Sequence, residues 1–539
     1  MADTLLVLML AALAVAAFLW NREWVFFAGD VFFVDGDCYA RMTRVRLLEG
    51  APFAPLRVHG FENFPDGTVP HTTFPLDGLI LLLRWILAPL GATALPIAGA
   101  FVSPILGLFT LLFLAWWASR LALPFRWPAL IVFAVSPMAA QAFLLGRPDH
   151  QSLVVLLVAV ALGAEAAMWL GRKAVGWRYA AAAAWALALW TSLFEPLIVL
   201  GVVLALRGVR RLVFGESGAR PAFGPVGVFA GILLVAFFWD GWRAGGFDPH
   251  FRDWAATIGE LRGAPPLVLL AWCGWLLPVV IVLLGWNTFR NRFPSALLWL
   301  GLLVVVTGLT LWHARWGYLL VLVFAMSLPD ALVVIRPAVV AFVVFVVSLF
   351  PIASEWDAML FPEDTVFRAR AENLADAVAV RDAAQILRWR PAGAVLAPWW
   401  LSPSIVWWSG FPTVGGTSHQ SLPGIVDSAR FYLSENDADA VDILLRRRAR
   451  YVFGYDPGRL VENSVQILRV NAPGQPMAAR LFSREVPAEL ALLYGNRLVR
   501  VFELRSAYLE HEQELTVSPL WSSNVEGRSA GETNRRGED

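Results

Sequence analysis

Long runs of apolar residues recur along the chain as far as about residue 352, separated by short polar segments. A helix needs roughly 20 residues to cross the hydrocarbon core of a bilayer, and several of these runs are shorter than that. The pattern nevertheless predicts a polytopic α-helical membrane protein with about eleven spans. The runs fall near residues 4–20, 95–118, 128–145, 152–170, 179–194, 197–206, 224–239, 266–285, 295–312, 316–329 and 337–352.

The polar segments between these runs predict the orientation of the chain. The stretch 75–91 is apolar but interrupted by Asp77 and Arg84, and we treat it as non-spanning. The run 4–20 has no basic segment before it and is expected to be a retained helix rather than a signal peptide. With a cytoplasmic N-terminus every interior loop is then basic, as the positive-inside rule requires. The basic residues are Arg120, Arg126, Arg172, Lys173, Arg178, Arg207, Arg210, Arg211, Arg220, Arg290, Arg292 and Arg336.

This orientation places segments 21–74, 143–151 and 240–265 outside, together with everything after about residue 353. We therefore expect a transmembrane domain over 1–352 with a long first outer loop at 21–94. A small mixed α/β domain is expected outside the membrane over 353–515, with amphipathic helices at 372–389 and 437–449 and strands at 394–398, 450–455 and 498–504. The polar segment 516–539 has the composition of a disordered tail.

Composition agrees with this membrane assignment and excludes some functions. Hydrophobic residues occupy 58% of the 539 positions and charged residues 16%, against about 45–50% and about 25% in soluble domains. The net charge of +1 gives no reason to expect a nucleic-acid partner. Cys38 and Cys273 are the two cysteines, too few and too far apart in sequence for a disulfide framework or a CxxC metal site.

Three acidic motifs lie in the outer segments. Asp35-Gly36-Asp37 could bind a divalent cation through its carboxylates or could be a solvated turn. Asp149, with His150 and Gln151 beside it, begins a predicted helix, where an acid is also favoured as a plain cap. Glu260 closes a Thr257-Ile258-Gly259-Glu260 motif and would mean little alone.

Basic and aromatic candidates lie on the same side. The guanidinium of Arg315, preceded by His313, suits bidentate binding of phosphate oxygens, although snorkelling to the interface is the plain alternative. Trp399 and Trp400 could line an acceptor groove or form a core. All of these motifs lie on one side of a topology that is derived only from arginine and lysine positions. Their readings as a solvated turn, a helix cap, a snorkelling arginine or a core do not predict this coincidence.

In this order, the motifs resemble the catalytic subunit of oligosaccharyltransferase, in its single-chain bacterial and archaeal form, a glycosyltransferase of the GT-C class. Further matches are Tyr39 and Arg41 after the first acidic motif, and Phe64-Pro65-Asp66-Gly67 in the first outer loop. The resemblance implies a GT-C-like fold with up to about 13 transmembrane helices. It also implies a Mn²⁺ or Mg²⁺ ion held by Asp37, Asp149 and Glu260, with Asp35, His150 and Gln151 as neighbouring candidates.

For the substrates, the resemblance implies that Arg315, with His313, binds the lipid pyrophosphate and that Trp399, Trp400 and Thr257 contact the acceptor. The chain departs from the family at Leu401, which replaces the aspartate of a Trp-Trp-Asp motif, and at Gln151, where an acid or histidine is usual. The expected activity is glycan transfer from a polyprenyl-pyrophosphate lipid to asparagine of a protein or peptide, at the periplasmic face of a bacterial inner membrane.

Two other functions stay open. One is a GT-C transferase that glycosylates a hydroxyl of protein, lipid or polysaccharide, which the Leu401 departure favours. The other is a transporter or polysaccharide-export component without chemistry, although transporters place ionisable residues near the midplane of the bilayer rather than in outer loops.

Overall fold

The computed structural model describes residues 2–52, 54–70, 72–172, 174–214, 223–241, 248–505 and 508. The predicted tail 516–539 and the predicted interior residues Lys173 and Arg220 lie outside this described part. The chain divides into two compact units. We call them the helical unit, Met1–Val34, Thr72–Trp242 and Ile258–Arg368, and the mixed unit, Asp35–His71, Arg243–Thr257 and Ala369–Asp539.

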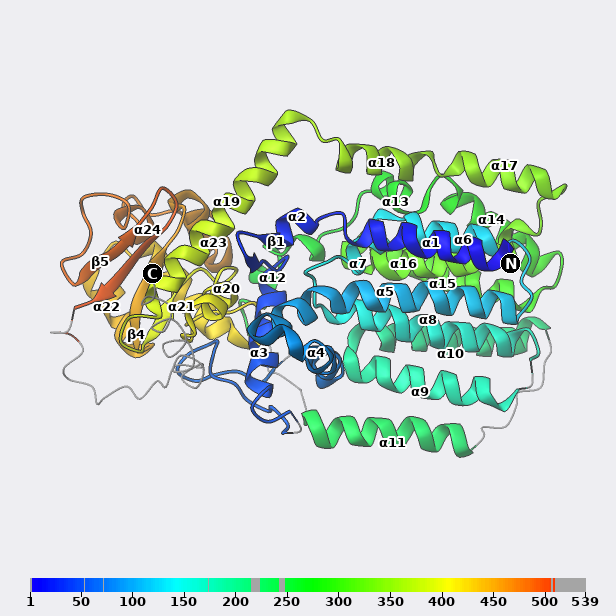
Figure 1. Cartoon of the computed structure of the whole chain (residues 1–539), viewed down its shortest axis with the longest axis horizontal. Helices are drawn as coiled ribbons and strands as arrows, with labels where there is room; N and C mark the ends of the chain where they lie inside the picture. The colour runs from blue at the N-terminus through cyan, green and yellow to red at the C-terminus, as the bar shows by residue number, and fades with distance from the viewer. Residues whose placement is uncertain are drawn as a thin grey trace, which may run out of the picture. The chain divides into compact units, whose positions relative to one another are not determined.

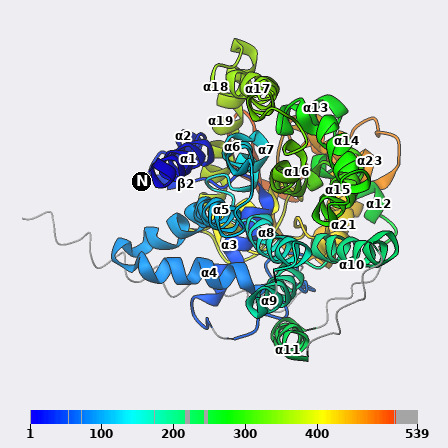
Figure 2. The ribbon, with the colours of Figure 1, turned by 90° about the vertical axis from the view of Figure 1, so that its right-hand side faces the viewer.

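The helical unit is built from long apolar helices that run side by side, with α5, α8 and α9 as clear examples in Figure 1 and seen end-on in Figure 2. Its α-helices are α1 (Ala2–Phe18), α2 (Arg22–Val25), α4 (Phe74–Ile86), α5 (Ala94–Arg120), α6 (Arg126–Val135), α7 (Pro137–Ala142), α8 (His150–Trp169), α9 (Val175–Thr191), α10 (Phe194–Phe214), α11 (Phe223–Asp240), α13 (Pro266–Cys273), α14 (Leu276–Phe289), α15 (Pro294–Trp312), α16 (Gly317–Leu332), α17 (Ala338–Ser348) and α18 (Phe350–Leu360). Three 3₁₀ turns, η1 (Ala88–Thr93), η2 (Gly259–Leu261) and η3 (Ala314–Trp316), and the short strands β1 (Phe26–Phe27) and β2 (Asp30–Val31) complete it.

Six helices of the described chain are long and apolar enough to cross a membrane, and a seventh candidate is the pair α13 and α14, which is bent by 81°. Their surroundings differ widely. The window of α16 is 94% buried, whereas that of α11 is 0% buried although its mean hydropathy is 1.8. A helix that is apolar all round and exposed needs an apolar solvent. The prediction of a polytopic helical membrane protein is therefore confirmed.

Breaks in the apolar runs have local causes. The predicted run 128–145 splits into α6 and α7 at Ser136, which precedes Pro137, because the residue before proline disfavours helical backbone. The run 266–285 bends at Gly274, whose φ is +79°. A Cβ at Gly274 would lie 2.4 Å from the Ser348 carbonyl oxygen, so a larger residue fits neither the backbone nor the space.

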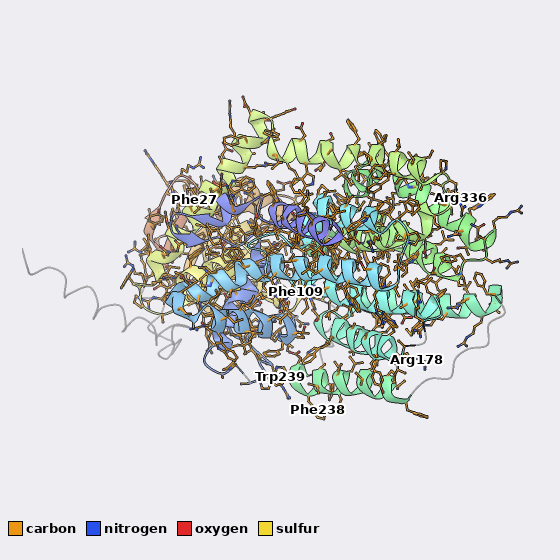
Figure 3. The ribbon with its side chains drawn as sticks, turned by 45° about the vertical axis from the view of Figure 1, so that its right-hand side comes forward. Phe27, Phe109, Arg178, Phe238, Trp239 and Arg336 are labelled. Carbon is orange, nitrogen blue, oxygen red and sulfur yellow. The ribbon has the colours of Figure 1, made fainter. Side chains whose placement is uncertain are left out.

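Four side chains labelled in Figure 3 mark the two ends of the helical unit. Arg178 and Arg336 lie toward one end of the helices, whereas Phe27 and Trp239 lie toward the other (Figure 3). The end with the arginines carries the loops that the sequence assigns to the interior.

The mixed unit contains a four-stranded sheet in the order β3-β4-β6-β5. The strands β3 (Ala394–Leu396) and β4 (Ala449–Gly454) pair in parallel, and β6 (Arg500–Leu504) pairs antiparallel with both β4 and β5 (Leu490–Gly495). The helices of the unit are α3 (Gly36–Leu48), α12 (Phe251–Ala255), α20 (Ser402–Ser409), η4 (His419–Ser421), α21 (Leu422–Leu433), α22 (Asp437–Arg446), α23 (Pro457–Leu468), α24 (Met477–Arg480) and most of α19 (Asp364–Leu387). The predicted small mixed domain near the C-terminus is confirmed.

The mixed unit also includes Asp35–His71 and Arg243–Thr257. The sequence assigned both segments to outer loops of the membrane domain. The domain boundaries at 352/353 and 515/516 stay a prediction.

Candidate functional site

Arg315 lies between two carboxylates in the helical unit. Its Nη2 is 2.5 Å from Oε1 of Glu195, and its Nη1 is 3.8 Å from Oε1 of Glu260. The two partners differ in burial, because the side chain of Glu195 is 1% exposed and that of Glu260 is 38% exposed. The pair with Glu195 is thus short and dry, and the pair with Glu260 is long and open to water.

Backbone bonds between η2 and η3 bring Glu260 to Arg315. The Ala314 amide donates to the Arg262 carbonyl at 2.8 Å, and Nδ1 of His313 bonds the Leu261 carbonyl. His313, predicted to help bind pyrophosphate, therefore fastens the two turns together through this nitrogen. These contacts hold Glu260, the last residue of the Thr257-Ile258-Gly259-Glu260 motif, near Arg315. The sequence alone does not reveal them.

Asp149 occupies the N-cap position of α8, but its side chain makes no capping bond. Its Oδ1 lies 2.6 Å from Nδ1 of His150, and its Oδ2 lies 3.9 Å from Nη2 of Arg147. Gln151 is buried and accepts a hydrogen bond from Arg147 at 3.3 Å. Asp149 is therefore available for more than a cap, and its charge also acts on Arg315.

Sequence reasoning missed two members of this site. Glu195 is the second residue of α10, and its Oε2 accepts a hydrogen bond from Ser192 at 2.6 Å. Tyr318, near the start of α16, is 2% exposed and lies close enough to Glu195 and Arg315 for their charges to act on it. An acid between two apolar runs is a signal of function that could have identified Glu195, whereas nothing in the sequence singles out Tyr318.

The mixed unit holds the first acidic motif. Asp35 caps α3, because its Oδ1 accepts the Cys38 amide at 3.0 Å, and Asp37 follows in the first turn. Nearby, burial and the charge of Asp37 raise the pKa of Glu62 to about 7. Glu62 lies 3.7 Å from His59, whose pKa burial and the charge of Arg44 lower to about 3. Near neutral pH the imidazole of this pair is therefore neutral, and the buried carboxyl of Glu62 is only partly ionised.

The predicted acceptor residues of the mixed unit form an aromatic cluster. Trp399 contacts Trp400 edge-on at 5.9 Å between ring centroids and contacts Trp254 at 5.6 Å. The indole of Trp399 donates to Asn463 at 2.9 Å, and the Thr257 hydroxyl donates to the Trp254 carbonyl at 2.6 Å. Leu401 precedes α20 as its N-cap residue, without a side-chain cap.

The helical unit brings Asp149, Glu260 and Arg315 into one charged cluster, while Asp35, Asp37, Trp399, Trp400 and Thr257 belong to the mixed unit. No group of three His, Cys, Asp or Glu side chains among the described residues is placed to hold a metal ion. In this arrangement Asp149 contacts His150, and Glu260 makes a long contact with Arg315.

Comparison of sequences finds no protein-family model and no curated protein that matches. Comparison of structures is informative. The oligosaccharyltransferase AglB of Archaeoglobus fulgidus, in complex with an inhibitory peptide and a dolichol-phosphate, matches with a TM-score of 0.65 and 14% identity over 84% of this chain and 69% of that one. The same enzyme in complex with Zn and sulfate matches with a TM-score of 0.63 and 14% identity, over 93% and 73% of the two chains.

A second enzyme, ArnT of Cupriavidus metallidurans bound to undecaprenyl phosphate, matches with a TM-score of 0.57 and 15% identity over 93% of this chain and 98% of that one. The chain has the GT-C glycosyltransferase fold. The resemblance to oligosaccharyltransferase is thereby confirmed at the level of the fold. The GT-C fold carries the charged cluster of the helical unit on α8, α10, η2, η3 and α16.

Proposed function

We propose that the protein is a membrane glycosyltransferase that transfers a glycan from a polyprenyl-pyrophosphate lipid to an acceptor. The observation that carries this proposal is Arg315, fixed by buried Glu195 and only loosely paired with exposed Glu260. A phosphate oxygen can replace Glu260 while Glu195 keeps the guanidinium of Arg315 in place. Arginine also suits bidentate binding of phosphate oxygens. The polyprenyl phosphates in the similar AglB and ArnT structures support the donor class.

The chemistry requires one substitution at carbon. The acceptor nucleophile attacks the anomeric carbon, the bond from this carbon to the lipid pyrophosphate oxygen breaks, and the nucleophile loses its proton. Arg315 stabilises the negative charge that develops on the leaving oxygen. When phosphate displaces Glu260 from Arg315, the freed carboxylate can accept a hydrogen bond or a proton from the acceptor. Oδ1 of Asp149 lies 2.6 Å from Nδ1 of His150, so the two side chains form an ion pair when the imidazole is protonated.

We also propose that the reaction uses Mn²⁺ or Mg²⁺, with Asp37, Asp149 and Glu260 as oxygen ligands and Asp35, His150 and Gln151 as neighbouring candidates. Such an ion would neutralise charge on the leaving pyrophosphate. The donor types support the proposal, whereas the pairing of Asp149 and Glu260 means that metal binding would have to draw them from His150 and Arg315.

For the acceptor, we propose asparagine of a protein or peptide, contacted by Trp399, Trp400 and Thr257. The aromatic cluster around Trp254 and Trp399 supports a contact surface of this kind. Leu401 favours a second candidate, transfer to a hydroxyl. The leucine side chain cannot accept a hydrogen bond from the Ser or Thr hydroxyl of an Asn-x-Ser/Thr acceptor sequence. Mapping glycopeptides of cells with and without the protein separates the two, since only the first leaves sugar on Asn-x-Ser/Thr.

The proposed location is a bacterial inner membrane, with the domain 353–515 in the periplasm. The basic residues of the predicted interior loops support this orientation. The proposed donor, a lipid with a long polyprenyl chain, also requires a site beside the membrane.

The test is transfer by purified protein from a defined polyprenyl-pyrophosphate glycan. Asp37→Ala, Asp149→Ala and Glu260→Ala should each lower kcat/KM at least a hundredfold, about 2.7 kcal/mol at the transition state, with normal membrane insertion. Asp442→Ala, which removes a 65% exposed carboxylate, is the control and should transfer normally. Adding EDTA, then Mn²⁺ or Mg²⁺, tests the ion. Wild-type transfer by all three variants would exclude this site, and no turnover of donor by wild type would favour a transporter.

A further inference from the structure

Three buried side-chain donors near the start of α16, on Arg315, Trp316 and Tyr318, lack acceptors among the described residues, and two of them belong to the charged cluster. The Nε–H of Arg315 and the hydroxyl of Tyr318 are both buried and have no hydrogen-bond partner among the described residues. A buried donor without a partner costs about 1–3 kcal/mol. Native proteins keep such groups rarely, and mostly where a ligand or a water satisfies them.

Geometry places these donors at the charged cluster. Arg315 and Tyr318 are three residues apart across the junction of η3 and α16, so their side chains share one helical face. The Tyr318 hydroxyl lies within reach of the charges of Glu195, Arg315, Asp149 and Glu260. Two carboxylates in this set are already engaged, because Glu195 holds Nη2 of Arg315 and Asp149 holds His150.

We infer that the Tyr318 hydroxyl and the Arg315 Nε–H together bind a phosphate oxygen of the lipid donor, and that Glu195 is the positioning residue that holds the guanidinium for this contact. This inference rests on the proposed function. A phosphate oxygen supplies several lone pairs and negative charge, which satisfies both donors at once. A carboxylate ligand would also satisfy both donors. The three carboxylates of the cluster would repel a carboxylate ligand as much as a phosphate. We favour phosphate because it is the group that the lipid donor carries.

Glu195 is suited to positioning because its Oε1 forms a close ion pair, although not a hydrogen bond, with Arg315, and its Oε2 accepts a hydrogen bond. Oε1 lies 2.5 Å from Nη2 of Arg315, and Oε2 accepts the Ser192 hydroxyl at 2.6 Å. At 1% exposure it has little contact with solvent, so its pair with Arg315 is weakly screened and stays formed when a ligand binds. Exposed Glu260 lacks this support and is the partner that phosphate displaces.

The test measures binding of undecaprenyl phosphate to the purified full-length protein in nanodiscs, beside thermal unfolding and transfer kinetics. Tyr318→Phe should raise the Kd for undecaprenyl phosphate, and the KM for donor, about tenfold. The same substitution should leave the Tm unchanged or slightly raised, because it removes an unsatisfied hydroxyl and keeps the ring.

Tyr432→Phe is the matched control. The Tyr432 hydroxyl is buried and donates to the Phe453 carbonyl at 2.9 Å, so its loss should lower the Tm and leave the Kd unchanged. Equal Kd values for Tyr318→Phe and wild type would overturn the inference and indicate that a buried water alone satisfies the hydroxyl. Failure of wild type to bind undecaprenyl phosphate would instead count against the proposed function.

Glu195 is tested by two substitutions. Glu195→Gln keeps an oxygen that can accept from Arg315, whereas Glu195→Ala removes the support altogether. Positioning predicts that kcat falls more in the alanine variant than in the glutamine variant, about tenfold between them, while the Kd for undecaprenyl phosphate changes little in the glutamine variant. Equal kcat in Glu195→Ala and wild type would exclude the positioning role.

Discussion

At the residue scale, the two carboxylates that pair with Arg315 differ in how much their loss would cost in free energy. An ion pair with an exposed partner contributes at most about 1 kcal/mol, because water and salt screen it. Removing one member of a buried pair costs far more, about 3–5 kcal/mol, because the other charge stays behind unpaired. Glu260 and Glu195 represent these two cases at Arg315. A single guanidinium therefore has a fixed attachment and an exchangeable one.

The neutral His59 of the mixed unit predicts a dependence of stability on pH. Its pKa falls from 6.5 to about 3 on folding, so below pH 6.5 the unfolded chain binds a proton that the folded chain does not. Stability from this residue is complete above pH 6.5 and falls on acidification by about 1.4 kcal/mol per pH unit. His59→Gln should therefore lose less Tm than wild type between pH 7.5 and pH 5.5, measured by thermal unfolding in detergent.

At pH 7.5 itself the variant should be the less stable protein. The His59 ring stacks on Phe61 at 3.8 Å between centroids and bonds the Thr68 hydroxyl at 3.2 Å, and glutamine loses the stacking. An equal loss of Tm on acidification in both proteins would show that His59 is protonated in the fold.

The residues that sequence could identify are those with chemistry of their own in an expected loop. Asp149, Glu260 and Arg315 were found because charge near a membrane is rarely incidental. Tyr318 could not be predicted from the sequence, because its proposed role depends on the lack of a hydrogen-bond partner for its hydroxyl, which becomes visible only in the folded structure. The relation of Asp37 to these residues stays a prediction, because Asp37 belongs to the mixed unit and the other three residues belong to the helical unit.

At the scale of elements, glycine sets how closely the helices pack. Gly107 in the middle of α5 faces Phe18 and Phe143, and a Cβ at this position would lie 2.6 Å from each ring. The two rings are themselves in contact, with centroids 5.4 Å apart. Small residues at such contacts let helices in a membrane approach each other.

Gly107→Leu should lower the Tm by several degrees, because overpacking a close contact costs about 1–3 kcal/mol. Gly231→Leu in α11 is the control, since no atom lies within 4 Å of a Cβ there and leucine favours the helix more than glycine does. Thermal unfolding of both variants in the same detergent measures the difference. An unchanged Tm in Gly107→Leu would mean that α5 can move away from the two rings.

The long apolar helices could be predicted because hydropathy alone specifies them, and α5, α8 and α15 agree with the predicted runs within two residues at each end. The strand β5 was missed. Its burial alternates irregularly and the register shifts between Leu492 and Tyr494, so it lacks the period of two that identifies a strand. The short helix α20 was missed because eight residues hold too few turns for a recognisable period.

At the scale of the whole molecule, orientation decides whether the proposed function is possible, because the charged cluster must face the side where donor and acceptor meet. Positive loops predict that the end of the helical unit with Arg178 and Arg336 is cytoplasmic. The two native cysteines, Cys38 and Cys273, are buried, so a single exposed cysteine reports its own side with little background.

Ser119→Cys and Ser483→Cys replace exposed serines with a nearly isosteric thiol, in the last turn of α5 and in the mixed unit respectively. In spheroplasts a membrane-impermeant maleimide should label Ser483→Cys at once and Ser119→Cys only after permeabilisation. Arg120 beside Ser119 favours the thiolate, so slow reaction of that cysteine would reflect access rather than chemistry. The reverse labelling order would place the mixed unit in the cytoplasm and exclude a periplasmic transferase. Labelling of both cysteines in intact spheroplasts would contradict the predicted number of membrane crossings between them.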